Sequence, residues 1–164
     1  ARNGAKVIAV DANPTKEATA RKFGATAFVL ADPAQDSDVA AAALANTYGP
    51  IDVVVECSGS VGAINTAFRC TKRGGRVVLI GMSRPGAEAA LPLGSFVMGG
   101  EVIATMNGGA LPQRDYPELI AQARDGRLNI ADQISGIWPL DQINEAIAAL
   151  KAGEVTRAVI DHEM

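Results

Sequence analysis

The 164-residue sequence contains few of the side chains from which catalytic and metal sites are usually built. It has one histidine, His162, and two cysteines, Cys57 and Cys70, with no C-x-x-C spacing. This scarcity excludes a Ser-His-Asp or Cys-His group, so no catalytic residue is assigned. A metal site within the chain is not expected either. We interpret both cysteines as reduced thiols of a cytoplasmic protein.

Aromatic residues and clustered basic charge are also scarce. Aromatic residues make up 4% of the chain, and the formal net charge of −3 comes from charges scattered along its whole length. Nucleic-acid binding is not expected, because it requires a basic surface, often with interleaved aromatic rings. The apolar runs are too short for a membrane span, and the first residues do not resemble a signal peptide. We therefore expect no membrane partner.

Short apolar runs alternate with segments of helical periodicity along the chain. Several runs lack the apolar–polar alternation of a half-exposed strand, as expected for parallel strands covered on both faces. The pattern predicts one α/β domain over residues 1–164, with a doubly wound parallel sheet of the Rossmann type. The expected strands are Lys6–Val10, Ala25–Leu30, Ile51–Glu56, Arg76–Gly81, Glu101–Met106, Gln133–Trp138 and Arg157–Asp161.

Helices are expected between these strands, and most have a recognisable start or stop signal. The stretch Met82–Gly100, rich in glycine and proline, is instead expected to be an irregular excursion. The expected helix starts are Asn13-Pro14, Asp36 or Ser37, Asp115 or Tyr116-Pro117, and Asp141. The expected helix ends are Gly24, Gly49-Pro50, and the basic turn before Gly74-Gly75.

The run KVIAVDANP places an acid, Asp11, directly after an apolar strand. In dinucleotide-binding folds, an acid at the end of the second strand accepts hydrogen bonds from the hydroxyls of the adenosine ribose. That carboxylate would repel a 2′-phosphate, so it favours NAD over NADP. Helix capping is the alternative role, but Asn13 stands directly before Pro14 and serves better. Lys16 could approach the ribose or its phosphate; the alternative is a solvated helix residue.

Two other strands end in small residues, in VVVECSGS and VVLIGM. The carboxyl ends of parallel strands meet at one edge, so with Asp11 they predict a ligand site there. No G-x-G-x-x-G turn follows any strand, and Asp11 would belong to the second strand. The glycine-rich turn and the first strand are therefore expected upstream of Ala1. We expect such an N-terminally truncated domain to be stable only when another chain, a swapped neighbour or upstream residues fill the vacant strand position.

The order of five segments resembles the NAD-binding half of the zinc-dependent medium-chain alcohol dehydrogenases. The resemblance extends from Gly4 to Asp161, and the C-terminal part is similar to the branch that includes glutathione-dependent formaldehyde dehydrogenase. Sorbitol and threonine dehydrogenases share much of the same pattern. The segments are GAKVIAVDANPTKEATARKFGAT, GPIDVVVECSGS, RGGRVVLIGM, RDYPELIAQARDGRLNI and PLDQINEAIAALKAGEVTRAVI.

The resemblance implies NAD as the cofactor and a set of residues that bind it. The acid matching Asp11 binds the adenosine ribose, and the lysine matching Lys16 supports it. The segment matching Ser58 and Gly59 lies against the adenine side. The arginine matching Arg157 pairs with the pyrophosphate.

On the nicotinamide side, the resemblance implies contacts from the backbone matching Ile80, Gly81 and Met82, and from Asn107. In the family, the strand matching Glu101 to Met106 pairs with its copy in a second subunit. The resemblance therefore implies a homodimer or homotetramer formed through this strand.

The activity implied by the resemblance is hydride transfer from a zinc-bound alcohol to NAD, giving an aldehyde or ketone. The family's zinc ligands belong to a separate, mostly N-terminal domain and cannot be placed here, so this chain alone is expected to be inactive. Two alternatives stay open: a non-catalytic nucleotide-binding or regulatory Rossmann module, and an S-adenosylmethionine-dependent transferase, whose antiparallel last-strand hairpin is not visible. Zinc-free quinone reductases favour NADPH, and Asp11 argues against them.

Overall fold

The chain divides into two compact units in a computed structural model that describes residues 4–164. Unit 1 comprises the described residues up to Ala9, together with Asn13–Phe28 and Leu111–Met164. Unit 2 comprises Val10–Ala12 and Val29–Ala110. Among residues 4–164, none of the helices combines the length and the apolar character that a membrane span requires.

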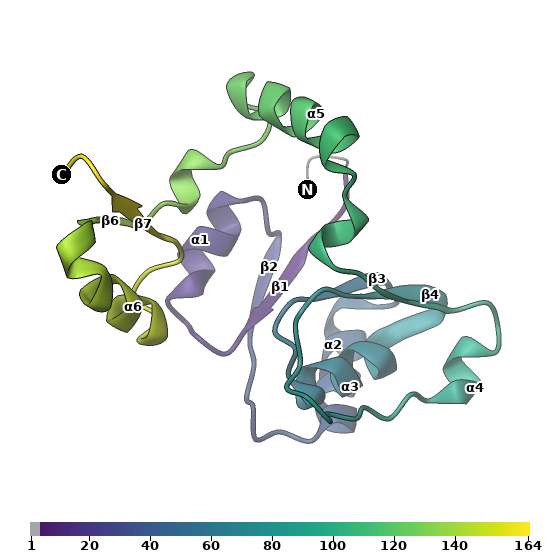
Figure 1. The fold of residues 1–164 in the computed structure, drawn as a ribbon. Helices are drawn as coiled ribbons and strands as arrows, with labels where there is room; N and C mark the ends of the chain where they lie inside the picture. The colour runs from purple at the N-terminus through teal and green to yellow at the C-terminus, as the bar shows by residue number, and fades with distance from the viewer. Residues whose placement is uncertain (1–3) are drawn as a thin grey trace. The chain divides into compact units, whose positions relative to one another are not determined.

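Unit 2 contains a parallel sheet with the strand order β3-β4-β5. Figure 1 labels β3 and β4 of this sheet and the helices α2, α3 and α4. Helix α3 packs on β3 and β4, α2 packs on α3, and α4 packs on β4. The register aligns Val54 of β3 with Val77 of β4, and Val77 with Val102 of β5. The elements are α2 (Ser37–Tyr48), β3 (Ile51–Glu56), α3 (Val61–Cys70), β4 (Thr71–Leu79), α4 (Leu93–Phe96) and β5 (Glu101–Ala104).

The core of unit 2 lies between this sheet and α3. Its buried members are Ile64, Ala67 and Phe68 from α3 and Val77 from β4. Phe68 meets Phe96 edge to face, with ring centroids 6.0 Å apart and ring planes at 85°. Such a pair is more favourable than burial of the same area alone. This packing fixes the positions of β3 and β4, whose ends carry several predicted site residues.

Unit 1 contains a second parallel pair, β6 (Gly136–Pro139) and β7 (Ala158–Asp161). Helix α6 (Ile143–Lys151) connects the two strands and packs on both. Of the apolar residues of this helix, Ala146 is buried, whereas Ile143, Ile147 and Leu150 stay 40–44% exposed. The unit also holds α1 (Lys16–Lys22), α5 (Pro112–Arg124) and the 3-10 turns η2 (Ala131–Gln133) and η3 (Leu140–Gln142).

Strands β1 (Ile8–Asp11) and β2 (Ala27–Leu30) pair with each other. Backbone bonds run from Thr26 N to Val7 O at 2.8 Å and from Ala31 N to Asp11 O at 2.9 Å. From the first bond to the second, the residue numbers increase on both strands, so the two strands run in the same direction and the pairing is parallel. Within the described residues, β1 pairs only with β2, and β3 pairs only with β4. The expected α/β fold class with parallel sheets is confirmed.

Three expected helix starts were wrong by a few residues. Helix α1 has Thr15 at its N-cap, because the Asn13 side chain accepts hydrogen bonds from Thr15 N (3.0 Å) and Thr15 Oγ1 (2.7 Å) in a turn before the helix. Helix α5 begins at Pro112, not at Asp115 or Tyr116, with Pro117 inside it. The residue at the N-cap of α6 is Gln142, because Asp141 lies in the preceding 3-10 turn.

The expected basic end of α3 was also wrong. The helix ends at Cys70, and β4 begins at once with Thr71, whose hydroxyl donates to Ala67 O at 2.7 Å. Lys72 pairs with Asp52 across the two strands. The ion pair of Lys72 with Asp52 on β3 therefore favours a strand over a further helical turn. In the same unit, the expected start of α2 at Asp36 is confirmed, because the Asp36 carboxylate caps this helix.

Candidate functional site

The carboxyl ends of β3 and β4 touch through two glycines. A Cβ atom built on Gly81 would lie 2.2 Å from Gly59 N, and one built on Gly59 would lie 2.3 Å from Met82 O. No side chain fits at such distances, and Gly59 also has a φ of +71° that favours glycine. The Ser83 hydroxyl donates to Gly59 O at 2.8 Å. The two strand ends therefore form one continuous wall.

Glu56, the last residue of β3, is 5% exposed, and its carboxylate lies against the Gly81 backbone. Its carboxylate accepts hydrogen bonds from Ser58 N at 2.8 Å, Ser58 Oγ at 2.5 Å and Gly59 N at 3.0 Å. Its main-chain oxygen accepts from Ile80 N at 2.9 Å and Gly81 N at 3.0 Å. One residue therefore bonds to both strand ends.

A pocket of about 380 Å³ opens at the end of β3 and the start of α3. The Ser58 hydroxyl, which lines it, already donates to Glu56 and accepts from Ser60 N at 3.1 Å. The N-cap residue Ser60 makes no side-chain capping bond, and both Val61, the first residue of α3, and the positively charged Arg84 line the pocket. The lining residues are Ser58, Gly59, Ser60, Val61 and Arg84.

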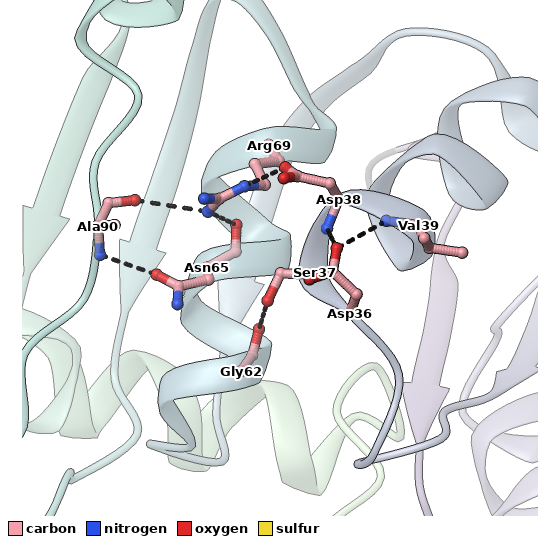
Figure 2. A network of polar contacts seen from close by, with 8 residues as sticks. All are labelled: Asp36, Ser37, Asp38, Val39, Gly62, Asn65, Arg69 and Ala90. Atoms are coloured by element: carbon pink, nitrogen blue, oxygen red, sulfur yellow. Dashed lines mark hydrogen bonds and ion pairs between the residues drawn. The ribbon is translucent and has the colours of Figure 1, made fainter.

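The loop that follows β4 and carries Arg84 is attached to α3 by the network in Figure 2. Asn65 Oδ1 accepts a hydrogen bond from Ala90 N at 2.9 Å. The Arg69 guanidinium donates to Asn65 O at 3.2 Å and to Ala90 O at 3.5 Å, and it forms an ion pair with Asp38 of α2. The network therefore connects α2, α3 and the loop within unit 2.

A second set of contacts in Figure 2 holds the start of α2. Asp36 Oδ1 accepts from Asp38 N at 2.8 Å and from Val39 N at 3.4 Å. Ser37 Oγ donates to Gly62 O, in the first turn of α3, at 3.3 Å. These contacts brace the end of α3 that borders the pocket.

Five of the predicted site residues are brought together by unit 2. Ser58 and Gly59 lie after β3, and Ile80, Gly81 and Met82 lie after β4, where the Met82 side chain is 90% exposed. The predicted positions along these two strand ends therefore lie next to one another, and their role in binding stays a prediction.

The other predicted residues of unit 2 lie on separate segments. Asp11 is the exposed last residue of β1, and its main-chain oxygen pairs with Ala31 N. Asn107 begins the 3-10 turn η1 (Asn107–Gly109) with a φ of +52°, a conformation uncommon outside glycine. The roles predicted for both residues stay predictions.

Two predicted residues, Lys16 and Arg157, belong to unit 1. Lys16 Nζ donates to Gly153 O and Val155 O, each at 3.3 Å, in the segment between α6 and β7. Arg157 is exposed, and its backbone bonds to Ser135 at the start of β6. Lys16 therefore has a role in holding this segment, whatever else it binds.

Glu56 and Arg84 were missed as site residues by the sequence reasoning. Glu56 carries a signal that could have found it: like Asp11, it is an acid at the end of an apolar strand. Arg84 carries none, because it lies in a loop without periodicity and reaches the pocket only through the fold of the β4 loop.

Cys57 offers a chemical reporter for this site. Partial desolvation raises the pKa of the Cys57 thiol, although the residue is exposed overall, and the neighbouring Glu56 charge raises that pKa further. The thiolate is the reactive form, so we expect alkylation by iodoacetamide to be slow at neutral pH and to accelerate above the ordinary thiol range. Substitution of Glu56 by Gln removes this negative charge, so the increase of the Cys57 alkylation rate should begin at lower pH. Mass spectrometry separates Cys57 from buried Cys70, and an unshifted profile would contradict the influence of Glu56.

No three His, Cys, Asp or Glu side chains lie together as a metal site would require, within the part of the chain that the structure describes. The polar groups at the strand ends instead suit a ligand with hydroxyl or anionic groups, because backbone N–H groups and an arginine border the pocket.

Residues 1–125 match the family model described as zinc-binding dehydrogenase. The chain belongs to this family. Among curated zinc-binding dehydrogenase relatives, it is 31% identical over 161 residues to the S-(hydroxymethyl)glutathione dehydrogenase of Paracoccus denitrificans, covering 94% of this chain and 42% of that protein. It is 32% identical over 156 residues to the class-3 alcohol dehydrogenase of Myxine glutinosa, covering 94% and 41%. The chain thus spans about two fifths of the length of these relatives.

A solved structure of a putative zinc-binding dehydrogenase from Sinorhizobium meliloti 1021, bound to NADP, has a TM-score of 0.76 and 28% identity. The match covers 94% of this chain and 44% of that one. The family assignment predicted from the five segments is therefore confirmed.

Proposed function

We propose that this member of the zinc-binding dehydrogenase family binds NAD and presents it for hydride transfer in an alcohol dehydrogenase. The observation that carries the proposal is the continuous wall formed by the ends of β3 and β4 beside the pocket. A dinucleotide is expected at the carboxyl edge of parallel strands, where small residues permit close approach to the backbone. The residues present fit such a ligand.

The roles proposed for individual residues are those that the resemblance to the family implies, and the chemistry of each group suits them. Asp11 accepts hydrogen bonds from the adenosine ribose hydroxyls, with Lys16 nearby in sequence as a supporting cation. Ser58 and Gly59 contribute the wall on the adenine side. Arg157 neutralises pyrophosphate charge.

On the nicotinamide side, the backbone at Ile80, Gly81 and Met82 orients the carboxamide and ribose, and Asn107 adds a polar contact. When bound, NAD supplies the acceptor for hydride. All the chain's own residues in this proposal bind and orient; none moves a proton.

The preference for NAD over NADP is the test of the proposal. The relative from Sinorhizobium meliloti was solved with NADP, but the Asp11 carboxylate should repel a 2′-phosphate. We expect NAD to bind at least roughly tenfold more tightly than NADP, and Asp11→Asn to remove most of this difference. Calorimetric titration of the purified chain with each cofactor measures both affinities. Asp141→Asn, the same charge change on unit 1, should keep the preference; equal NAD and NADP affinity in the wild type would contradict the role of Asp11.

The whole enzyme is proposed to oxidise a small alcohol to an aldehyde or ketone in the cytoplasm. Its zinc would be held by residues outside this chain, and residues 1–164 would form one dinucleotide-binding domain. A non-catalytic nucleotide-binding or regulatory module is the alternative, and it would also bind NAD. The relatives named as dehydrogenases favour the enzyme. Adding S-adenosylmethionine to the titration tests the transferase alternative, which requires that ligand to bind.

We also propose that β5 joins two copies of the chain into a homodimer, or pairs of copies into a homotetramer. All residues of β5 are exposed, and β4 is its only paired neighbour among the described strands. Thr105 N bonds to Leu79 O, so by alternation the Val102 and Ala104 backbone groups face the free edge. Such an edge is a template for pairing with a second strand.

A proline at Val102 should prevent this association, since it removes an outward N–H without breaking the bonds to β4. We expect Val102→Pro to give a monomer by light scattering coupled to gel filtration. Val102→Ala keeps the N–H and should still associate. A monomeric wild type, or an associated Val102→Pro variant, would contradict the proposed interface.

A further inference from the structure

Glu56 is a buried acid at the end of a strand whose other residues are mostly apolar. It is 5% exposed, and placing a carboxylate in such surroundings is costly unless hydrogen bonds replace its lost water. The structure supplies them: two main-chain N–H groups and one hydroxyl, all from the two residues Ser58 and Gly59. No buried side-chain oxygen or nitrogen in the described residues lacks a hydrogen-bond partner.

The donors to Glu56 come from the turn that borders the pocket. Both N–H groups must point toward the carboxylate, which fixes the peptide planes between Cys57 and Gly59. The Ser58 hydroxyl is oriented at the same time, because it donates to Glu56 and accepts from Ser60 N. Hydrogen bonds to an ionised carboxylate are about twice as strong as neutral ones, so this turn is held firmly.

The same residue also reaches the second strand end. Its main-chain oxygen accepts from Ile80 N and Gly81 N, and a Cβ on Gly81 would lie 2.8 Å from Glu56 Oε2. The Gly81 backbone therefore fits directly against the carboxylate. Four of the proposed cofactor-binding residues are in contact with Glu56: Ser58, Gly59, Ile80 and Gly81.

We propose that Glu56 is a positioning residue for the nucleotide site: its buried carboxylate holds the turn after β3 against the end of β4 in the conformation that receives the cofactor. The inference rests on the proposed function, since it concerns how the same site is held in shape. Glu56 acts through Ser58, Gly59 and Gly81.

The test compares Glu56→Gln with wild type in NAD affinity and in local amide exchange. Glutamine has the same size, but its NH₂ group would face an N–H donor of Ser58 or Gly59. We expect NAD to bind about tenfold more weakly, and the Ser58 and Gly59 amides to exchange at least tenfold faster relative to the Val54 and Val77 amides. A merely structural role would raise exchange evenly across the sheet. Glu88→Gln, the same charge change on an exposed residue of unit 2, should leave both measurements unchanged.

Two further results separate the outcomes. If the wild type does not bind NAD, the proposed function fails; if it binds NAD and Glu56→Gln binds equally well, the positioning role fails. Evenly raised exchange would overturn the positioning role too. If Glu56→Gln does not fold, Ser58→Ala decides, because it keeps both N–H donors to Glu56 and removes the hydroxyl that donates to Glu56 and accepts from Ser60 N. It should bind NAD about threefold more weakly, and unchanged affinity would overturn the proposal.

Discussion

Replacement of Gly81 by alanine is expected to lower the free energy of unfolding by on the order of 3 kcal/mol and to remove NAD binding. The new methyl group would lie 2.2 Å from Gly59 N, 2.7 Å from the Cys57 carbonyl carbon and 2.8 Å from a Glu56 oxygen. Two of these atoms belong to the backbone and cannot rotate away. The two strand ends would have to separate, which opens the wall of the site.

Gly62→Ala is the matched control for Gly81→Ala. Gly62 lies in the first turn of α3, and its Cβ would meet only the Ser60 hydroxyl, at 3.8 Å. Alanine favours the helix there, so the control should be slightly more stable than wild type, by about 0.5–1 kcal/mol. Urea unfolding followed by circular dichroism gives both values. A Gly81→Ala variant with wild-type stability would show that the strand ends are not in close contact.

Truncation of Phe68 to alanine is expected to cost about 3–5 kcal/mol of unfolding free energy. Phe68 is 5% exposed at the centre of the unit 2 core, and its ring contacts Phe96 edge to face. Alanine would leave a cavity between α3 and the sheet and would remove the aromatic contact. Because this core supports β3 and β4, we expect the site at their ends to be lost as well.

Urea unfolding measures the effect of Phe68→Ala, and Phe23→Ala is its control. Phe23 is 37% exposed in unit 1, so its truncation should cost less than half as much. Equal losses for the two variants would mean that Phe68 does not occupy a well-packed core position.

The clearest success of the sequence was β3, for which the predicted and observed bounds are both Ile51–Glu56. Its apolar run is flanked by Gly49-Pro50 before it and by small residues after it, and these signals are local. The cap at Asp36 was predicted for the same reason. The start of α5 was wrong because Pro117 was interpreted as a first-turn proline, whereas the helix already begins at Pro112.

The end of α3 shows how tertiary pairing overrides a local signal. Its basic residues and glycines are typical of a helix end, but the chain enters β4 at Thr71, which is aligned with Ile51 of β3. The ion pair of Lys72 with Asp52 forms across these strands. A sequence pattern does not include a partner that lies on another strand.

The sequence by itself determined the order of strands and helices, the acid at the end of β1 and the small residues after β3 and β4, because these depend on local periodicity and on breakers. Only the tertiary structure decided that Gly59 and Gly81 touch, that Glu56 is buried between them and that Arg84 reaches the pocket. These features arise from packing between segments distant in the chain. Their distances and burial become defined only when α3 and β4 close on β3.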